Sequence, residues 1–116
     1  MRHRSKKVTL DRKSGPRKAL LSGLVCQVIL YEKIKTTEAK AKAVKPMVER
    51  VITRGKTDTL ANRRILLSRL PIKKAVKKVF EVLGPKYKDR KGGYLRLIKI
   101  GPRKGDGAPI VQIELV

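Results

Sequence analysis

Lysine and arginine make up 31 of the 116 residues, against nine aspartates and glutamates, so the formal net charge is +22. Ammonium and guanidinium groups bind phosphate oxygens through charge-assisted hydrogen bonds, and arginine does so with a planar fork. So many cations on so short a chain repel one another unless a polyanion neutralises them. The composition therefore predicts a phosphate-rich partner, either a nucleic acid or an anionic membrane.

The cations group in an N-terminal arm (residues 1–13), the first turn of the helix after it, one face of a later helix, and two glycine-containing segments at 86–93 and 101–107. Glycine lets backbone amides approach phosphates closely. The candidate phosphate-binding residues are Arg2, His3, Arg4, Lys6, Lys7, Arg12, Lys13, Arg17, Lys18, Lys73, Lys74, Lys77, Lys78, Lys88, Arg90, Lys91, Arg96, Arg103 and Lys104.

Three of these candidates, Arg90, Arg96 and Arg103, can each hold a phosphate through two parallel bonds. Aromatic residues make up only 3% of the chain, so a platform that stacks several bases is not expected. Tyr87 or Tyr94 could stack on one unstacked base or could pack beside a hairpin. Donors spread over several regions favour a folded RNA, because duplex-DNA binders usually concentrate their charge on one element.

Catalytic and metal sites are not expected. The single histidine, His3, lies in the arm, which supplies no fixed scaffold for a nucleophile and its base. One histidine and one cysteine cannot make a tetrahedral metal site alone, and residues 101–107 lack the Gly-Lys-Ser/Thr end of a phosphate-binding loop. We therefore expect no enzyme, no cofactor and no small-molecule substrate. Cys26 is expected to be a small buried hydrophobe.

The apolar periodicity predicts an α+β domain over residues 14–116. A wide apolar arc between Leu20 and Ile29 indicates a mostly buried helix with Ser14 as its N-cap. A short strand is expected at 31–36. The longest apolar stretch is far shorter than the ~20 residues of a membrane span.

Three further helices are expected. The first runs from about residue 38 to 53, begins at the capping residues Thr36 and Thr37, and kinks at Pro46. The next is capped by Thr57 or Asp58 and stops at Pro71. The third covers 72–83, with an apolar arc beside a lysine arc, and stops at Gly84-Pro85.

Alternating residues predict two final strands, at 94–100 and 110–116, paired as an antiparallel hairpin with a long loop. The last ten residues contain no lysine or arginine, which indicates that the last strand is in the core. The chain is thus divided into a basic arm at 1–13 and one globular domain at 14–116. The arm has too few apolar residues to order itself, so we expect it to order on RNA.

Several stretches carry a family likeness along nearly the whole chain. They are residues 1–4 (MRHR), 17–21 (RKALL), 32–42 (EKIKTTEAKAK), 87–94 (YKDRKGGY) with Arg96, 101–106 (GPRKGD), 108–109 (AP) and 114–116 (ELV). Together they resemble the bacterial large-subunit ribosomal protein L17 family. The chain departs from the usual family pattern at Pro16, where a histidine is common.

The resemblance implies a structural component of the bacterial 50S subunit that binds 23S rRNA beside neighbouring ribosomal proteins in the cytoplasm. It also implies a two-layer α/β fold with the order helix, short strand, three helices, two-strand hairpin, and a mixed three-stranded sheet. Two alternatives remain open: a DNA-compacting or other nucleic-acid chaperone, and a membrane-active cationic peptide. The second is disfavoured because the apolar positions are committed to one core.

Overall fold

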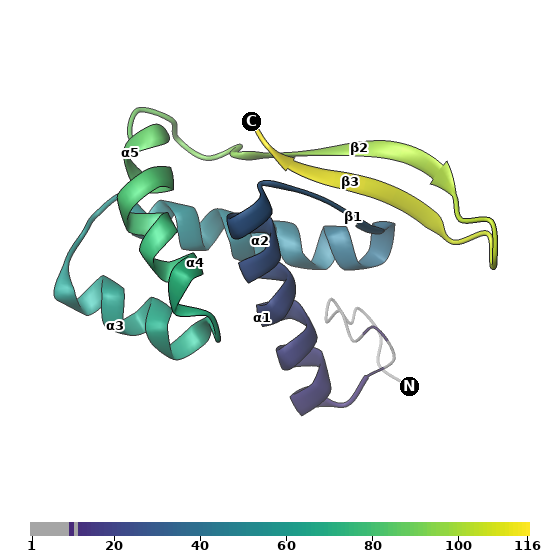
Figure 1. Cartoon of the computed structure of the whole chain (residues 1–116), viewed down its shortest axis with the longest axis horizontal. Coiled ribbons are helices and arrows are strands. Elements are labelled where there is room, and N and C mark those ends of the chain that lie inside the picture. The colour runs from purple at the N-terminus through teal and green to yellow at the C-terminus, as the bar shows by residue number, and fades with distance from the viewer. Residues whose placement is uncertain (1–9, 11) are drawn as a thin grey trace, which may run out of the picture.

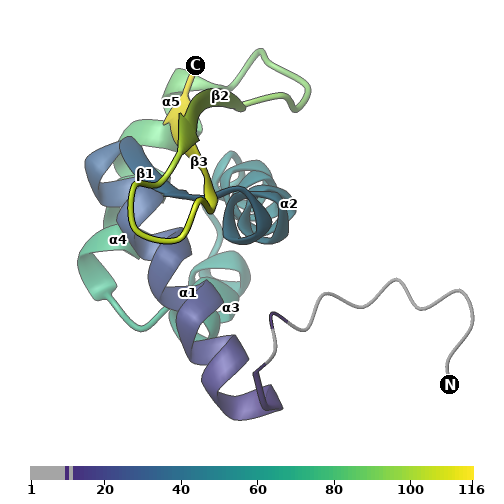
Figure 2. The same ribbon diagram turned by 90° about the vertical axis from the view of Figure 1, so that its right-hand side faces the viewer.

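Helices cover one face of a small three-stranded sheet, and the other face of the sheet is open (Figures 1 and 2). The computed structural model describes residue 10 and residues 12–116, so most of the predicted arm lies outside the described residues. The elements are α1 (Ser14–Tyr31), β1 (Lys33–Thr37), α2 (Glu38–Gly55), α3 (Leu60–Arg69), α4 (Lys73–Lys78), the π-helical segment η1 (Val79–Leu83), α5 (Gly84–Lys86), β2 (Leu95–Pro102) and β3 (Pro109–Leu115). The predicted α+β class is confirmed.

The sheet has the order β1-β3-β2, and β3 is antiparallel to both neighbours. Ile113 at its centre pairs with Ile34 of β1 and with Leu97 of β2. The predicted mixed sheet is therefore wrong, while the predicted hairpin is confirmed. β1 and β2 run in the same direction, but β3 lies between them, so no parallel pair forms.

Alternation along β3 separates a buried face from a polar one. Val111 and Ile113 are buried against the helices, as predicted for a core strand, while Glu114 lies between β1 and β2 on the opposite face. Cys26 is fully buried in the same core, as predicted, and burial raises the pKa of its thiol.

Two of the predicted helix starts are displaced by one or two residues. Lys13 takes the N-cap position of α1 without a side-chain bond, so Ser14 is its first helical residue and not its cap. The hydroxyl of Thr37 caps α2 as predicted. Thr59 caps α3 in place of Thr57 or Asp58.

The last helical segment does not stop at Gly84-Pro85, as the sequence predicted, but continues to Lys86. The N–H of Gly84 donates to the carbonyl of Val79, five residues back, which makes a π turn. A new helical segment, α5, begins after this turn, and Pro85 lies in its first turn. The N–H that proline lacks would have no partner within the helix at this position, so no hydrogen bond is lost. No helix of the described residues is long and apolar enough to cross a membrane.

Candidate nucleic-acid interface

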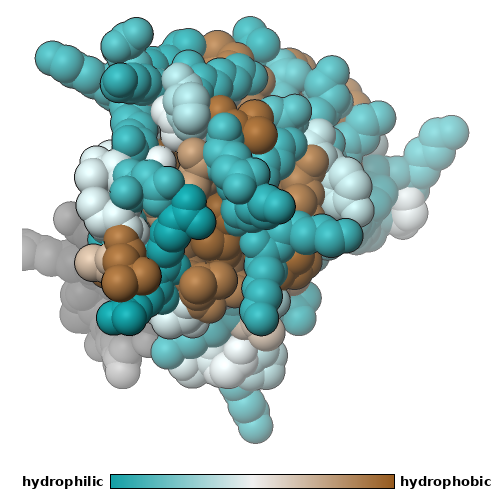
Figure 3. Space-filling view, turned by 60° about the vertical axis from the view of Figure 1, so that its left-hand side comes forward, coloured by the Kyte–Doolittle hydropathy of each residue, from teal (hydrophilic) through white to brown (hydrophobic). Residues whose placement is uncertain are grey.

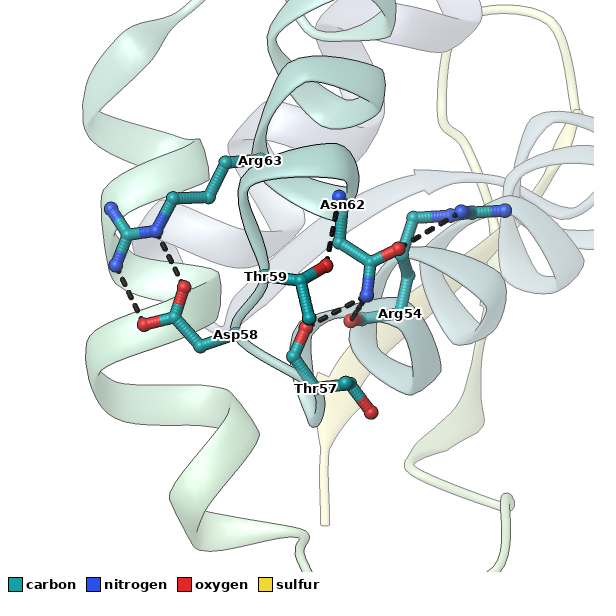
Figure 4. Close-up of polar contacts among 6 residues, drawn as sticks. All are labelled: Arg54, Thr57, Asp58, Thr59, Asn62 and Arg63. Atoms are coloured by element: carbon teal, nitrogen blue, oxygen red, sulfur yellow. Dashed lines mark hydrogen bonds and ion pairs between the residues drawn. The ribbon is translucent and has the colours of Figure 1, made fainter.

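The corner between α2 and α3 is fixed by side-chain hydrogen bonds to the backbone (Figure 4). Asn62 donates through Nδ2 to the carbonyl of Thr57 at 2.8 Å and to that of Arg54 at 3.4 Å, and its own N–H donates to Thr59 Oγ1 at 3.2 Å. The guanidinium of Arg54 donates to Asn62 Oδ1 at 3.3 Å. Arg54 is therefore held in place by neutral partners, and no carboxylate of the described residues pairs with its charge.

A second contact at this corner joins α3 to η1. Asp58 accepts two bonds from Arg63 (Figure 4), which hold the pKa of the carboxyl below its usual range. The guanidinium of Arg63 also lies 5.0 Å from the ring centre of Phe80. Arg63 is thus committed to contacts within the chain.

The first predicted cationic region lies around the start of α1. Arg12, Lys13 and Lys18 are exposed, and the guanidinium of Arg17 donates to the carbonyl of Arg12 at 3.2 Å. Arg2, His3, Arg4, Lys6 and Lys7 lie outside the described residues.

The second region, on α4, is smaller than predicted. Lys73, Lys74 and Lys77 are exposed, but Lys78 is largely covered. Its ammonium donates to the carbonyl of Leu30 at 3.1 Å and lies 3.7 Å from the carboxylate of Glu32. Lys78 therefore fastens α4 to the end of α1, since its long side chain reaches the carbonyls left open there.

The remaining candidates lie in the connection after α5 and on the β2–β3 hairpin. Lys88, Arg90, Lys91 and Lys104 are exposed and have no ion-pair partner among the described residues. Arg96 instead pairs with Glu114 at 2.8 Å, and that carboxylate also lies 3.7 Å from Lys33 on the far side of β3. The Arg96 fork is already engaged on the open face of the sheet.

Arg103 is likewise engaged, in the loop that joins β2 to β3. It donates twice to Asp106, at 3.0 and 2.6 Å, and this pairing holds the pKa of Asp106 far below its usual range. A phosphate can take the fork of Arg103 only by displacing this carboxylate.

The variant Asp106→Asn should therefore bind RNA more tightly, and its log K should depend more steeply on log salt by roughly 0.7–0.9, the increment for one additional bound phosphate. The asparagine keeps the oxygen that accepts the N–H of Ala108 at 3.1 Å, so the loop should hold its shape. Salt-dependent RNA titrations measure this. Asp89→Asn is the matched control, because it removes another exposed acid, one that forms no ion pair among the described residues. Equal gains in both variants would contradict the role of Arg103.

The two candidate stacking tyrosines pack inside the protein. Tyr87 and Tyr94 are buried with ring centres 5.1 Å apart, and the hydroxyl of Tyr87 donates to the carbonyl of Val116 at 2.8 Å. Burial raises the pKa of Tyr94, but hydrogen bonds with Lys56 and Thr53 outweigh it and lower the pKa. Packing beside the hairpin, the second of the two predicted roles, is the one observed.

The exposed cations point in several directions. The start of α1, the segment after α5 and the tip of the β2–β3 loop lie at separate ends of a molecule that measures 42 × 31 × 26 Å (Figures 1 and 2). The face formed by α3, α4 and α5 shows hydrophobic side chains between long hydrophilic ones (Figure 3). Leu60 and Leu67 of α3 are exposed, and so is Val82 of η1 between α4 and α5.

Three cations that the sequence analysis did not select gather around a cavity between α1, α2 and α3. Arg50, Arg54 and Arg69 line it together with aliphatic side chains. They were missed because Arg50 and Arg54 on α2 and Arg69 on α3 lie on helices whose apolar pattern indicates plain packing. Only the crossing of α2 with α3 brings them together.

Residues 20–116 match the family described as Ribosomal protein L17. The chain belongs to the ribosomal protein L17 family. It is 50% identical over 107 residues to the large ribosomal subunit protein bL17 of Thermoanaerobacter sp. (strain X514), covering 92% of this chain and 96% of that protein. It is 47% identical over 116 residues to the bL17 protein of Rickettsia bellii (strain OSU 85-389), covering all of this chain and 82% of that one.

Membership in this family makes the chain a structural part of the ribosome and not an enzyme. The family resemblance carried by the motifs is confirmed. The functional surface is consequently one that binds.

Proposed function

We propose that this protein is a structural constituent of the large (50S) ribosomal subunit, in the cytoplasm, where it binds 23S rRNA and supports translation. Binding uses the basic arm at residues 1–13, the basic loops and the lysines of α4, and neighbouring ribosomal proteins complete its surroundings. The observation that carries this proposal is the distribution of exposed cations over separate ends of one small domain of the L17 family.

The exposed cations are suited to phosphates because carboxylates do not neutralise them. Among the described residues of the predicted set, only Lys78, Arg96 and Arg103 form ion pairs within the chain. The others release counterions when they meet phosphates, and this release drives association at low salt. A folded RNA surrounds the domain and can meet all these ends at once, which a straight duplex cannot do.

The test is a competition at matched salt between a folded 23S rRNA fragment and a DNA duplex with the same number of phosphates. We expect the protein to prefer the folded rRNA clearly. A nucleic-acid chaperone of the DNA-compacting type would bind both equally or prefer the duplex, and that result would overturn the proposal.

Deleting residues 1–13 should lower rRNA affinity while leaving the melting temperature nearly unchanged. Six of those residues are basic and few are apolar, so the segment adds charge and little burial. Each phosphate that the shortened protein no longer binds should reduce the steepness of log K against log salt by roughly 0.7–0.9. Titrations at several salt concentrations, paired with thermal melts, measure both effects. Undiminished affinity would remove the arm from the binding surface.

A further inference from the structure

The cavity between α1, α2 and α3 has a volume of about 550 Å³ and an aliphatic floor that includes Val25, Val51 and Leu66. This volume lies within the ~300–1,000 Å³ of sites that hold small organic groups. Ser22 and Ser68 are the uncharged polar residues of its wall. The cavity thus combines an apolar interior with few polar groups.

The cavity is the middle of a longer groove. Towards α4 it meets a second hollow, with which it shares Lys18, Ser22 and Arg69, and which extends to Lys73. In the other direction it meets a third hollow, which contains Thr57 and Gly92 and shares Arg50, Arg54 and Arg69 with the cavity. The groove therefore runs from the start of α4 to the segment between α5 and β2.

Positive charge follows the groove from end to end. Among the described residues, Glu49 is the one acid in the lining of these hollows, and it lines the third. None of the lining cations forms an ion pair within the part of the chain that the structure describes. These cations are Lys18, Arg50, Arg54, Arg69 and Lys73.

We propose that this groove binds an extended single-stranded segment of RNA, with successive phosphates on the cations and one unstacked base in the apolar cavity. The inference rests on the proposed function, because it names which part of a folded rRNA the domain reads at this surface. Arginine planes can stack on a base where aromatic residues are absent, and aliphatic walls contact both of its faces. The anchored guanidinium of Arg54 is already oriented at one end of the cavity.

An acidic peptide fits the groove less well. Helices form its walls, and their backbone groups are already bonded, so no free strand edge is offered to an extended peptide. The cations recur along the groove, as the phosphates of a nucleic-acid strand do. An oligonucleotide carries that charge on every residue.

The charge test uses the full chain with Lys18→Gln, Arg50→Gln and Arg69→Gln, which leaves the Arg54–Asn62 corner intact. The probe is a single-stranded RNA of about 10 nucleotides, within the usual site sizes. Removal of three phosphate-binding cations should flatten the salt slope by roughly 2 and lower affinity on the order of 100-fold at 0.1 M salt. The matched control is Lys40→Gln, Lys45→Gln and Arg64→Gln, which removes the same charge from α2 and α3 outside the groove.

The base test uses Ser22→Phe, which fills the cavity from α1 and removes no charge. It should lower affinity for the single strand about tenfold and leave binding of an abasic strand of the same length unchanged. The three groove substitutions and Arg64 lie at exposed positions, and Lys40 and Lys45 are only partly buried, so the comparison of the charge variants stands even where Ser22→Phe unfolds the protein.

Equal losses in the groove and control triple variants would overturn the proposal. So would tighter binding of a Glu/Leu-rich peptide than of RNA at matched salt, or Ser22→Phe binding both strands as the parent does. These failures are distinct from failure of the proposed function. If only the groove proposal is wrong, the full chain still prefers folded 23S rRNA. If the proposed function is wrong, that preference is lost while any binding of the single strand remains.

Discussion

Deletion of residues 110–116 should abolish cooperative folding of the domain. β3 is the central strand, so its loss leaves β1 and β2 without a partner. Val111 and Ile113 are buried, and each such side chain contributes about 1.5–3 kcal/mol by burial alone. Together with the missing ladder hydrogen bonds this is comparable to the ~5–15 kcal/mol that stabilises a typical domain.

Far-UV circular dichroism and thermal melts check this result. Two point variants separate burial from strand loss: Ile113→Ala should cost about 2–5 kcal/mol, whereas Ile98→Ala, on the open face of β2, should cost within about 0.5 kcal/mol. A truncated chain that still melts cooperatively would show that the helices fold without the sheet.

The elements of the fold could be predicted because local patterns specify them. Alternation along residues 110–116 and the helical arc of α1 each identify a buried face without reference to the rest of the chain. The sheet type could not be predicted in this way. It depends on which strand lies beside β1, and that pairing joins Ile34 to Ile113, far apart in sequence.

In the candidate site, too, local patterns could be predicted and contacts between distant residues could not. Exposed lysines of α4 such as Lys73 follow from helical periodicity, but Lys78 reaches Leu30 only because α4 crosses the end of α1. Arg103 has its partner Asp106 three residues away, a pairing that short spacing could have suggested. The groove of Arg50 and Arg69 needs three helices to be packed before it exists.

The passage of the last helical segment through Gly84-Pro85 depends on a close crossing with α2. A Cβ at Gly84 would lie 2.4 Å from the backbone oxygen of Gly55, and a Cβ at Gly55 would lie 2.2 Å from Cγ1 of Val79. Both glycines are buried, and the two helices touch where they lie. Only residues without a Cβ allow this approach.

Gly84→Ala should therefore destabilise the domain by about 1–3 kcal/mol or more, because the atom it meets is backbone and the helix itself must move. Gly55→Ala should cost less, since it meets a side chain, and the added variant Val79→Ala should restore part of its stability.

Gly23→Ala in α1 is the control, because a Cβ at this position meets nothing within 4 Å and alanine is a better helix former than glycine. It should stabilise the domain by up to about 1 kcal/mol. Denaturant unfolding of the four variants ranks their free energies of unfolding. A Gly84→Ala protein as stable as the parent would mean that the two helices move apart at little cost and that their crossing does not set the position of η1.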